Sequence, residues 1–153
     1  VDRALEELGG DVQVVATLHA DWLTDKAYNV TTDLINSGTE FNYIFANNDM
    51  MAQGCYNALK DAGKENIPIV STGGSPDGFK MLQDGIEAAN MTAPVSIQGV
   101  KTFMNLYNKV ALGEDPAEKF TALPVIPVSA DDTSSYIAWD DYAAAYKYLG
   151  ENK

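Results

Sequence analysis

Residues 41–63 read FNYIFANNDMMAQGCYNALKDAG, and they contain the pattern that decides the fold class. The apolar run 41–46 is rich in strand-forming residues, which is typical of a strand covered on both faces. The polar tip 47–49 ends this run, and apolar residues at helical spacing follow it. Gly63 stands where a left-handed residue ends a helix. The stretch therefore predicts a strand, a polar tip and a helix, which make half of a βαβ unit.

The same order of strand and helix is expected three more times along the chain. The further strands are predicted at 13–18, 67–72 and 86–91. The helices after them are expected to start at Thr24 and Ser75, which are predicted N-caps, and at Pro94. Four such units predict an α/β fold with a doubly wound, mainly parallel sheet and helices on both faces, the Rossmann-like class.

The two ends of the chain depart from this rhythm. Residues 1–8 predict a helix without a start signal, so we expect the chain to begin in mid-helix. Residues 123–128 contain two prolines, which favours an edge strand or a crossing segment over a central strand. Residues 131–135 are expected to form a loop, and 140–149 a final helix.

Composition narrows the class of protein. The 153 residues are 46% hydrophobic, which suits one soluble globular domain, and no apolar stretch is long enough to span a membrane. The net charge of −12 disfavours nucleic acid and anionic membranes as partners. One cysteine, one histidine and no CxxC give no disulfide and no metal-binding pattern, so we expect no metal and no cofactor.

Motifs of catalysis are also missing from the sequence. The segment 73–78, GGSPDG, does not match GxGxxG and follows the third predicted strand instead of the first. No phosphate-binding GxxxxGK[ST] motif, no GxSxG motif and no second histidine are present. We therefore expect a binding protein and not an enzyme.

In a parallel sheet the predicted strand tips meet at one edge, which is where ligands bind in this class. The tips carry amides, hydroxyls, carboxylates and one large aromatic ring: His19, Asp21, Trp22, Asn47, Asn48, Asp49, Thr72, Gly73, Ser75, Asn90 and Thr92. An asparagine both donates and accepts, which suits a hydroxyl group, and an indole ring suits the C–H face of a sugar. The set points to a polyhydroxylated small molecule.

Several of these residues also have a purely structural explanation. Either Asp49 or Asn48 can cap the next helix, and Asp49 is the favoured cap. Because one cap suffices, Asn48 is the better candidate for a ligand contact. Trp22 can equally be a core aromatic, His19 has no partner that would make it a base, and Cys55 fits a buried stripe.

Three segments resemble a known family. Residues 44–63 (IFANNDMMAQGCYNALKDAG) resemble part of the C-terminal lobe of type I periplasmic sugar-binding proteins, the ribose- and galactose-binding group. Residues 20–35 (ADWLTDKAYNVTTDLI) and 67–85 (IPIVSTGGSPDGFKMLQDG) resemble the segments before and after it. The match extends from about 13 to 113, and 124–136 (PVIPVSADDTSSY) resembles the last hinge crossing and closing segment.

This resemblance implies a two-lobed protein that closes on a sugar and delivers it to the permease of an ABC transporter or to a chemoreceptor. The expected location is the periplasm, or the outer surface of a Gram-positive cell with a lipid anchor. Residues 1–128 would form the C-terminal lobe and 129–153 the closing loop and last helix. The N-terminal lobe would be absent from this chain, so we expect the chain alone to bind sugars weakly or undetectably.

The resemblance also assigns roles to residues. Trp22 is similar to the aromatic residue that stacks on the sugar ring, and Asn48 to an asparagine that bonds a sugar hydroxyl. Asp21 and Asp49 match motif positions that often support the ligand.

Two positions differ from the family pattern. Gly73 stands where the family has an aspartate, in a phrase like GFDGTPDG, so one polar contact with the ligand is lost. Thr92 is similar in position to the family's amide near the end of the fourth strand, and Asn90 lies two residues earlier. We therefore expect a different sugar, a polyol, a modified sugar or another small metabolite as the ligand.

Two other functions share this fold. The effector-sensing core of a LacI-type transcription regulator would bind similar ligands, and so would the sensor domain of a membrane receptor. A signal peptide or lipobox upstream would favour the transport protein, and a helix-turn-helix the regulator. A Rossmann-like enzyme is a more distant alternative.

Overall fold

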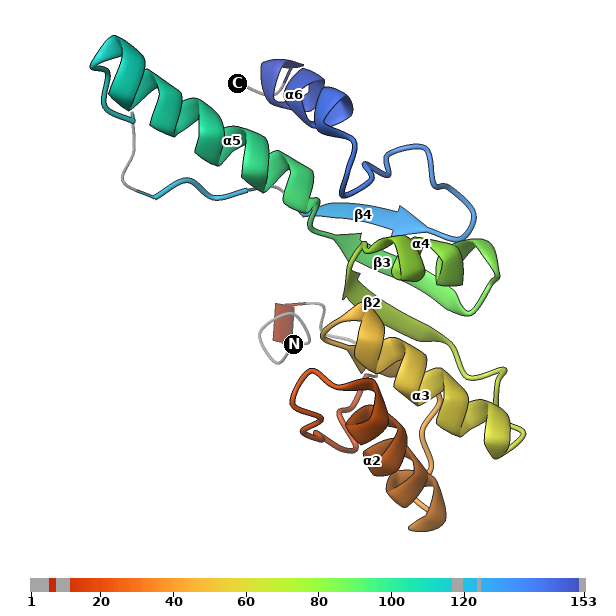
Figure 1. Ribbon diagram of the computed structural model, residues 1–153. Helices are drawn as coiled ribbons and strands as arrows, with labels where there is room; N and C mark the ends of the chain where they lie inside the picture. Colours follow the sequence, from red (N-terminus) through yellow and green to blue (C-terminus); the bar gives the residue numbers. More distant parts are fainter. Residues whose placement is uncertain (1–5, 8–11, 117–119, 124, 152–153) are drawn as a thin grey trace.

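A single four-stranded sheet organises the computed structural model, which describes residues 6–7, 12–116, 120–123 and 125–151 (Figure 1). The strands are β1 (Ile44–Ala46), β2 (Ile69–Gly73), β3 (Glu87–Thr92) and β4 (Ile126–Ser129), in that spatial order. The first three are parallel, and β4 runs antiparallel to β3 at the edge. The predicted mainly parallel α/β class and the edge position of the proline-containing strand are both confirmed.

Each parallel strand leads into a helix, as the sequence pattern predicts. These helices are α3 (Asp49–Asp61), α4 (Pro76–Gln83) and α5 (Val95–Tyr107), and α5 continues as a π-helical turn at Asn108–Leu112. Helices α3 and α4 lie on the same face of the sheet (Figure 1). Helix α2 (Thr24–Asn36) packs along α3, and α6 (Tyr142–Glu151) packs along α5.

Local sequence signals account for several helix ends. Ser75 is the N-cap of α4, because its Oγ accepts from the backbone N–H of Gly78 at 3.1 Å, and Pro76 follows in the first turn. Gly63 follows α3 with a φ of 66°, which confirms the predicted left-handed stop. The predicted cap Thr24 is wrong: Leu23 occupies the N-cap position of α2 and makes no side-chain bond.

The buried apolar side chains form two clusters. One joins α2, α3, α4, β1 and β2 around Leu59 and Ile69, and it includes Cys55, which is buried as predicted. The other joins α4, α5, β4 and α6 around Leu82, Ile97 and Val128. Among the described helices, none has both the length and the apolar character needed to cross a membrane.

The predicted strand at 13–18 is wrong. These residues pair with no strand of the described sheet, and Val14, Val15 and Leu18 are exposed. A strand needs a neighbouring backbone to complete its hydrogen bonds, and β-propensity alone does not supply one. Side chains of the segment instead lie beside α2 and β1 around an apolar cavity of about 170 Å³.

The first parallel strand is also shorter than expected, with three residues instead of six. Phe45 is 44% exposed, so the strand is not covered on both faces as its apolar run predicts. Of the helix predicted at 1–8, Glu6 and Glu7 are described and both are helical, while the rest lies outside the described residues.

Candidate functional site

The carboxyl edge of the sheet brings the predicted strand tips together. Thr72 Oγ1 donates to the carbonyl oxygen of Asn47 at 2.8 Å, which joins the tips of β1 and β2. The backbone N–H of Ala93 donates to the carbonyl oxygen of Gly73 at 3.0 Å, which joins the tips of β2 and β3. The parallel arrangement therefore gathers polar groups from distant parts of the chain at one edge.

Trp22 lies on a tight turn beside this edge. Asp21 and Trp22 have φ angles of 47° and 65°, and the N–H of Leu23 donates to Ala20 O at 2.9 Å to close the turn. A left-handed backbone is uncommon for a bulky residue. The Trp22 side chain is 63% exposed, so the alternative of a core aromatic is wrong.

Asp21 forms a surface ion pair within the same segment. Lys26 Nζ donates to Asp21 Oδ2 at 2.5 Å, and both side chains are exposed. The hydrogen bond and the charge of Lys26 hold the pKa of the Asp21 carboxyl below its ordinary value. Exposed pairs of this kind contribute little to stability, so the pair mainly links the turn to the first turns of α2.

Asn48 is the N-cap of α3, and the expectation that Asp49 fills this role is wrong. Asn48 Oδ1 accepts from the N–H of Met51 at 2.7 Å, whereas Asp49 is already the first helical residue. The other end of the amide, Nδ2, has a long contact of 3.5 Å with Trp22 O. One side chain thus caps the helix with its oxygen and keeps a donor beside Trp22.

The cap role of Asn48 leads to a prediction about stability. We expect Asn48→Ala to lower the free energy of unfolding by about 1 kcal/mol, because the first turn of α3 loses its acceptor. Asn48→Ser retains an N-cap acceptor, so we expect its free energy of unfolding to fall by only a few tenths of the loss in Asn48→Ala. Urea denaturation of both variants measures the difference, and equal losses would show that the cap does not stabilise α3.

Asp49 lies beneath the edge instead of on it. Its side chain is buried, with 5% exposed, and it accepts three hydrogen bonds. Oδ1 accepts from Ser71 Oγ at 3.1 Å and Asn90 Nδ2 at 2.7 Å, and Oδ2 accepts from the N–H of Ser75 at 2.7 Å. The carboxylate therefore ties the start of α3 to β2, β3 and the turn before α4.

Two glycines leave the space that Asp49 fills. A Cβ atom at Gly73 would lie 2.8 Å from Asp49 Oδ2, and one at Gly78 would lie 2.4 Å from Asp49 Cγ. Gly73 also has a φ of 134°, which side-chain-bearing residues rarely adopt. With Asp49 in this position, an aspartate at Gly73 would meet both steric and electrostatic repulsion.

Asn90 and Thr92 are also buried in this structure. Asn90 Nδ2 bonds to Asp49 and to Glu87, and Thr92 Oγ1 donates to the carbonyl oxygen of Ile126 at 2.8 Å. Neither side chain reaches the surface here. Contact of either residue with a ligand stays a prediction.

Glu87 is a member of this network that sequence reasoning missed. Its side chain is fully buried, with 0% exposed, and burial raises the pKa of its carboxyl to about 7. Glu87 Oε1 lies 2.9 Å from Ser71 Oγ, and Oε2 lies 3.0 Å from Asn90 Nδ2. The sequence feature that could have identified Glu87 is its position, since it is a carboxylate inside the apolar stretch that predicts β3.

The segment after β4 adds two aromatic residues that were not predicted for the site. Tyr136 OH donates to Gly74 O at 3.1 Å, and Trp139 Nε1 donates to Gly73 O at 3.3 Å. The ring of Tyr136 stacks on Phe79 with the centroids 3.8 Å apart. Since Gly73 O also accepts from Ala93, both of its lone pairs are used within the protein.

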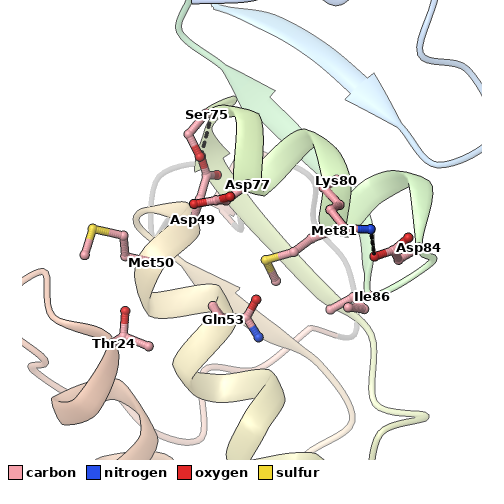
Figure 2. Close-up of a pocket in the computed structure, with 10 residues that line it drawn as sticks. All are labelled: Thr24, Asp49, Met50, Gln53, Ser75, Asp77, Lys80, Met81, Asp84 and Ile86. Atoms are coloured by element: carbon pink, nitrogen blue, oxygen red, sulfur yellow. Dashed lines mark hydrogen bonds and ion pairs between the residues drawn. The ribbon is translucent and has the colours of Figure 1, made fainter.

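A groove of about 280 Å³ lies next to this edge, between α3 and α4 (Figure 2). Ten residues line it: Thr24, Asp49, Met50, Gln53, Ser75, Asp77, Lys80, Met81, Asp84 and Ile86. It shares Asp49 and Ser75 with the network but does not include Trp22 or Asn48. The described residues contain no group of three or more His, Cys, Asp or Glu side chains that could hold a metal ion.

This sheet with its flanking helices is the architecture of a lobe of a type I periplasmic binding protein. The chain belongs to the family described as periplasmic binding protein domain, which matches residues 1–115. Its members are binding proteins and not enzymes.

Curated relatives support this assignment. The ribose import binding protein RbsB of Salmonella typhimurium is 35% identical over 107 residues, covering 70% of this chain and 36% of the relative. The xylitol-binding protein of Mycolicibacterium smegmatis is 37% identical over 76 residues, covering 49% of this chain and 22% of the relative. The matched part of this chain thus spans about a third or less of the length of each relative.

Solved structures show the same fold. A solute binding protein of an ABC transporter from Bacillus halodurans, solved with myo-inositol, has a TM-score of 0.74 and 22% identity. The match covers 98% of this chain and 47% of that one. A periplasmic solute binding protein from Actinobacillus succinogenes, solved with D-allose, has a TM-score of 0.77 and 23% identity, covering 84% of this chain and 44% of that one. At this level of identity the likeness concerns the fold.

Proposed function

We propose that this chain is one lobe of a two-lobed solute-binding protein, and that its carboxyl edge forms one wall of a site for a sugar or polyol. The observation that carries the proposal is that Trp22, with its exposed side chain, lies next to Asn48, whose Nδ2 contacts the backbone carbonyl oxygen of Trp22. Relatives named for binding ribose, allose and xylitol support the ligand class.

The exposed ring of Trp22 and the half-buried amide of Asn48 would have different roles at this site. The Trp22 ring offers an apolar face on which the C–H face of a sugar can stack. Asn48 Nδ2 can donate to a sugar hydroxyl. Its present contact with Trp22 O, at 3.5 Å, is long and weak, so exchanging it for a bond to the sugar costs little free energy. Asp49, Asn90 and Thr92 would support the edge from below, and Asp21 would hold the turn through Lys26.

Delivery of the ligand to an ABC transporter permease, outside the cytoplasmic membrane, is the biological role that fits this family. In that role the second lobe would supply the opposite wall of the site. The lost aspartate at Gly73 leaves this lobe with fewer charged contacts. We therefore favour ligands held mainly by stacking and neutral hydrogen bonds, including polyols.

A thermal-shift screen of the protein with both lobes tests the ligand class. Ribose, allose, xylitol and myo-inositol are the probes. A ligand at 100 times its Kd adds about 2.7 kcal/mol to the free energy of unfolding, so at least one probe is expected to raise the midpoint by several degrees. Absence of a shift with all four would argue against the proposed function.

The stacking role of Trp22 is tested by Trp22→Ala. We expect at least a tenfold loss of affinity for the ligand found in the screen, equivalent to about 1.4 kcal/mol, with little change in stability. Tyr146→Ala is the matched control, because Tyr146 on α6 is also 63% exposed. Isothermal titration calorimetry measures both affinities. Unchanged affinity in Trp22→Ala would show that the indole ring does not contact the ligand.

A further inference from the structure

The buried side chains of Asp49, Ser71, Glu87 and Asn90 form one continuous polar cluster beneath the carboxyl edge. Ser71 Oγ lies within hydrogen-bonding distance of both carboxyl groups, at 3.1 Å from Asp49 Oδ1 and 2.9 Å from Glu87 Oε1. Asn90 Nδ2 lies 2.7 Å from Asp49 Oδ1, 2.7 Å from Ser71 Oγ and 3.0 Å from Glu87 Oε2. The four side chains come from α3, β2 and β3.

The number of hydrogen atoms in this cluster is too small if both carboxyl groups are charged. The Ser71 hydroxyl has one hydrogen and can donate to only one of the two carboxylates. Its other contact would then place two oxygen lone pairs against each other in a buried site, which is unfavourable. One additional proton on a carboxyl group turns that contact into a hydrogen bond.

The surroundings of the two carboxyl groups decide which one holds the proton. Asp49 accepts from the N–H of Ser75 and from Asn90, besides the Ser71 hydroxyl. Glu87 accepts only from Asn90 once the Ser71 hydrogen points to Asp49. The charged form is better stabilised at Asp49, since each additional donor favours a carboxylate.

We propose that Glu87 is a neutral acid in the folded protein, and that it donates through Ser71 to position Asp49 and the turn between β2 and α4. The order of donation is Glu87 Oε1 to Ser71 Oγ, and Ser71 Oγ to Asp49 Oδ1. Asp49 Oδ2 then holds the N–H of Ser75. Glu87 is thus a positioning residue for the edge at which we propose that a sugar binds, and this role in binding rests on that proposed function.

Other charged groups near Glu87 do not replace this proton. Strands β2 and β4 carry no ionisable side chain, and Asp49 is the charged group that acts on Glu87 from α3. On α4, Asp77 and Lys80 are exposed and line the neighbouring groove. Loss of the proton would therefore place a second uncompensated charge beside Asp49.

The proposal predicts how stability depends on pH. The ordinary pKa of the glutamate carboxyl is 4.5, and burial raises it to about 7 in the folded protein. Between these values the folded state keeps a proton that the unfolded chain has lost, so stability falls as pH rises through this window and levels off above about 7. The contribution of the protonated Glu87 carboxyl to the free energy of unfolding is fully present below pH 4.5.

Thermal unfolding of the protein and its Glu87→Gln variant between pH 5 and 8 tests this inference. The midpoint of the wild type should fall by roughly 5 °C over this range. Glu87→Gln supplies a permanent neutral donor and should flatten the profile, whereas Glu87→Leu should be less stable at pH 5. Glu65→Gln, at an exposed position, should leave the profile unchanged.

A carboxyl titration by carbon-13 NMR supplies a second readout. A Glu87 carboxyl that titrates near 7 supports the proposal, and one that titrates near 4.5 overturns it, as would an unaltered pH profile in Glu87→Gln.

For the role in binding, affinity for ribose, allose, xylitol and myo-inositol is measured at pH 6 and 8. A severalfold loss at pH 8 that Glu87→Gln abolishes supports positioning, and equal affinities overturn it. If none of the probes binds at either pH, the result instead counts against the proposed function. The protonation of Glu87 is then tested by the NMR titration alone.

Discussion

Gly54→Ala is expected to lower the free energy of unfolding by about 3 kcal/mol, the upper part of the range for overpacked cores. A Cβ atom at this position of α3 would lie 2.2 Å from the carbonyl oxygen of Thr24 and 2.9 Å from Ala27 Cβ. The nearest atom belongs to the backbone of α2, so no side-chain rotation relieves the contact and the two helices must separate. Because α2 carries the Trp22 turn at its start, we also expect the loss of ligand binding.

The matched control for this prediction is Gly99→Ala. Gly99 also lies within a helix, α5, but an added Cβ atom would meet nothing within 4 Å. Alanine is the better helix former there, so the substitution should stabilise the protein by about 0.5–1 kcal/mol. Urea denaturation separates the two results, and equal effects in both variants would contradict the close α2–α3 contact.

Asp49→Ala is expected to lower the free energy of unfolding by about 4 kcal/mol. The substitution leaves the part-buried N–H of Ser75 without its acceptor, and a donor left unpaired in this way costs about 1–3 kcal/mol. It also removes the hydrogen bonds that the carboxylate accepts from Ser71 and Asn90, and bonds to a charged group are worth about 1.5–3 kcal/mol each. The turn that begins α4 loses its tie to α3 as well. Chemical denaturation monitored by circular dichroism gives the value.

Asp77→Ala is the control for Asp49→Ala. Asp77 is an exposed carboxylate in the first turn of α4, and its favourable interaction with the helix dipole is worth about 0.3–1 kcal/mol. A loss below 1 kcal/mol in Asp49→Ala, similar to that of the control, would show that the buried network does not hold the edge together.

Much of the architecture could be predicted from local patterns. The run 41–63 gave the strand, the tip and the left-handed stop at Gly63, and the pair Ser75-Pro76 marked the start of α4. These features depend on residues close together in the chain. The identity of the α3 cap was less accessible, because Asn48 and Asp49 are both good caps and the fold decides which one stays outside the helix.

Features that depend on distant neighbours could not be predicted. The segment 13–18 is rich in strand-forming residues, but this composition does not identify a partner strand, and the described sheet offers none. The bonds from Tyr136 and Trp139 to the turn after β2 span 62 and 66 residues of sequence. The same holds for Glu87, whose carboxyl meets Ser71 only because β2 and β3 are neighbours.

The proposal that the carboxyl edge binds a polyhydroxylated ligand is tested most directly by NMR of the protein with both lobes. Proton–nitrogen spectra are recorded while ribose, allose, xylitol and myo-inositol are added in turn. We predict that at least one of them shifts the indole N–H of Trp22 and the side-chain amide of Asn48 together. If saturating amounts of all four leave both signals in place, or if a bound sugar shifts only signals elsewhere, this edge is not the site.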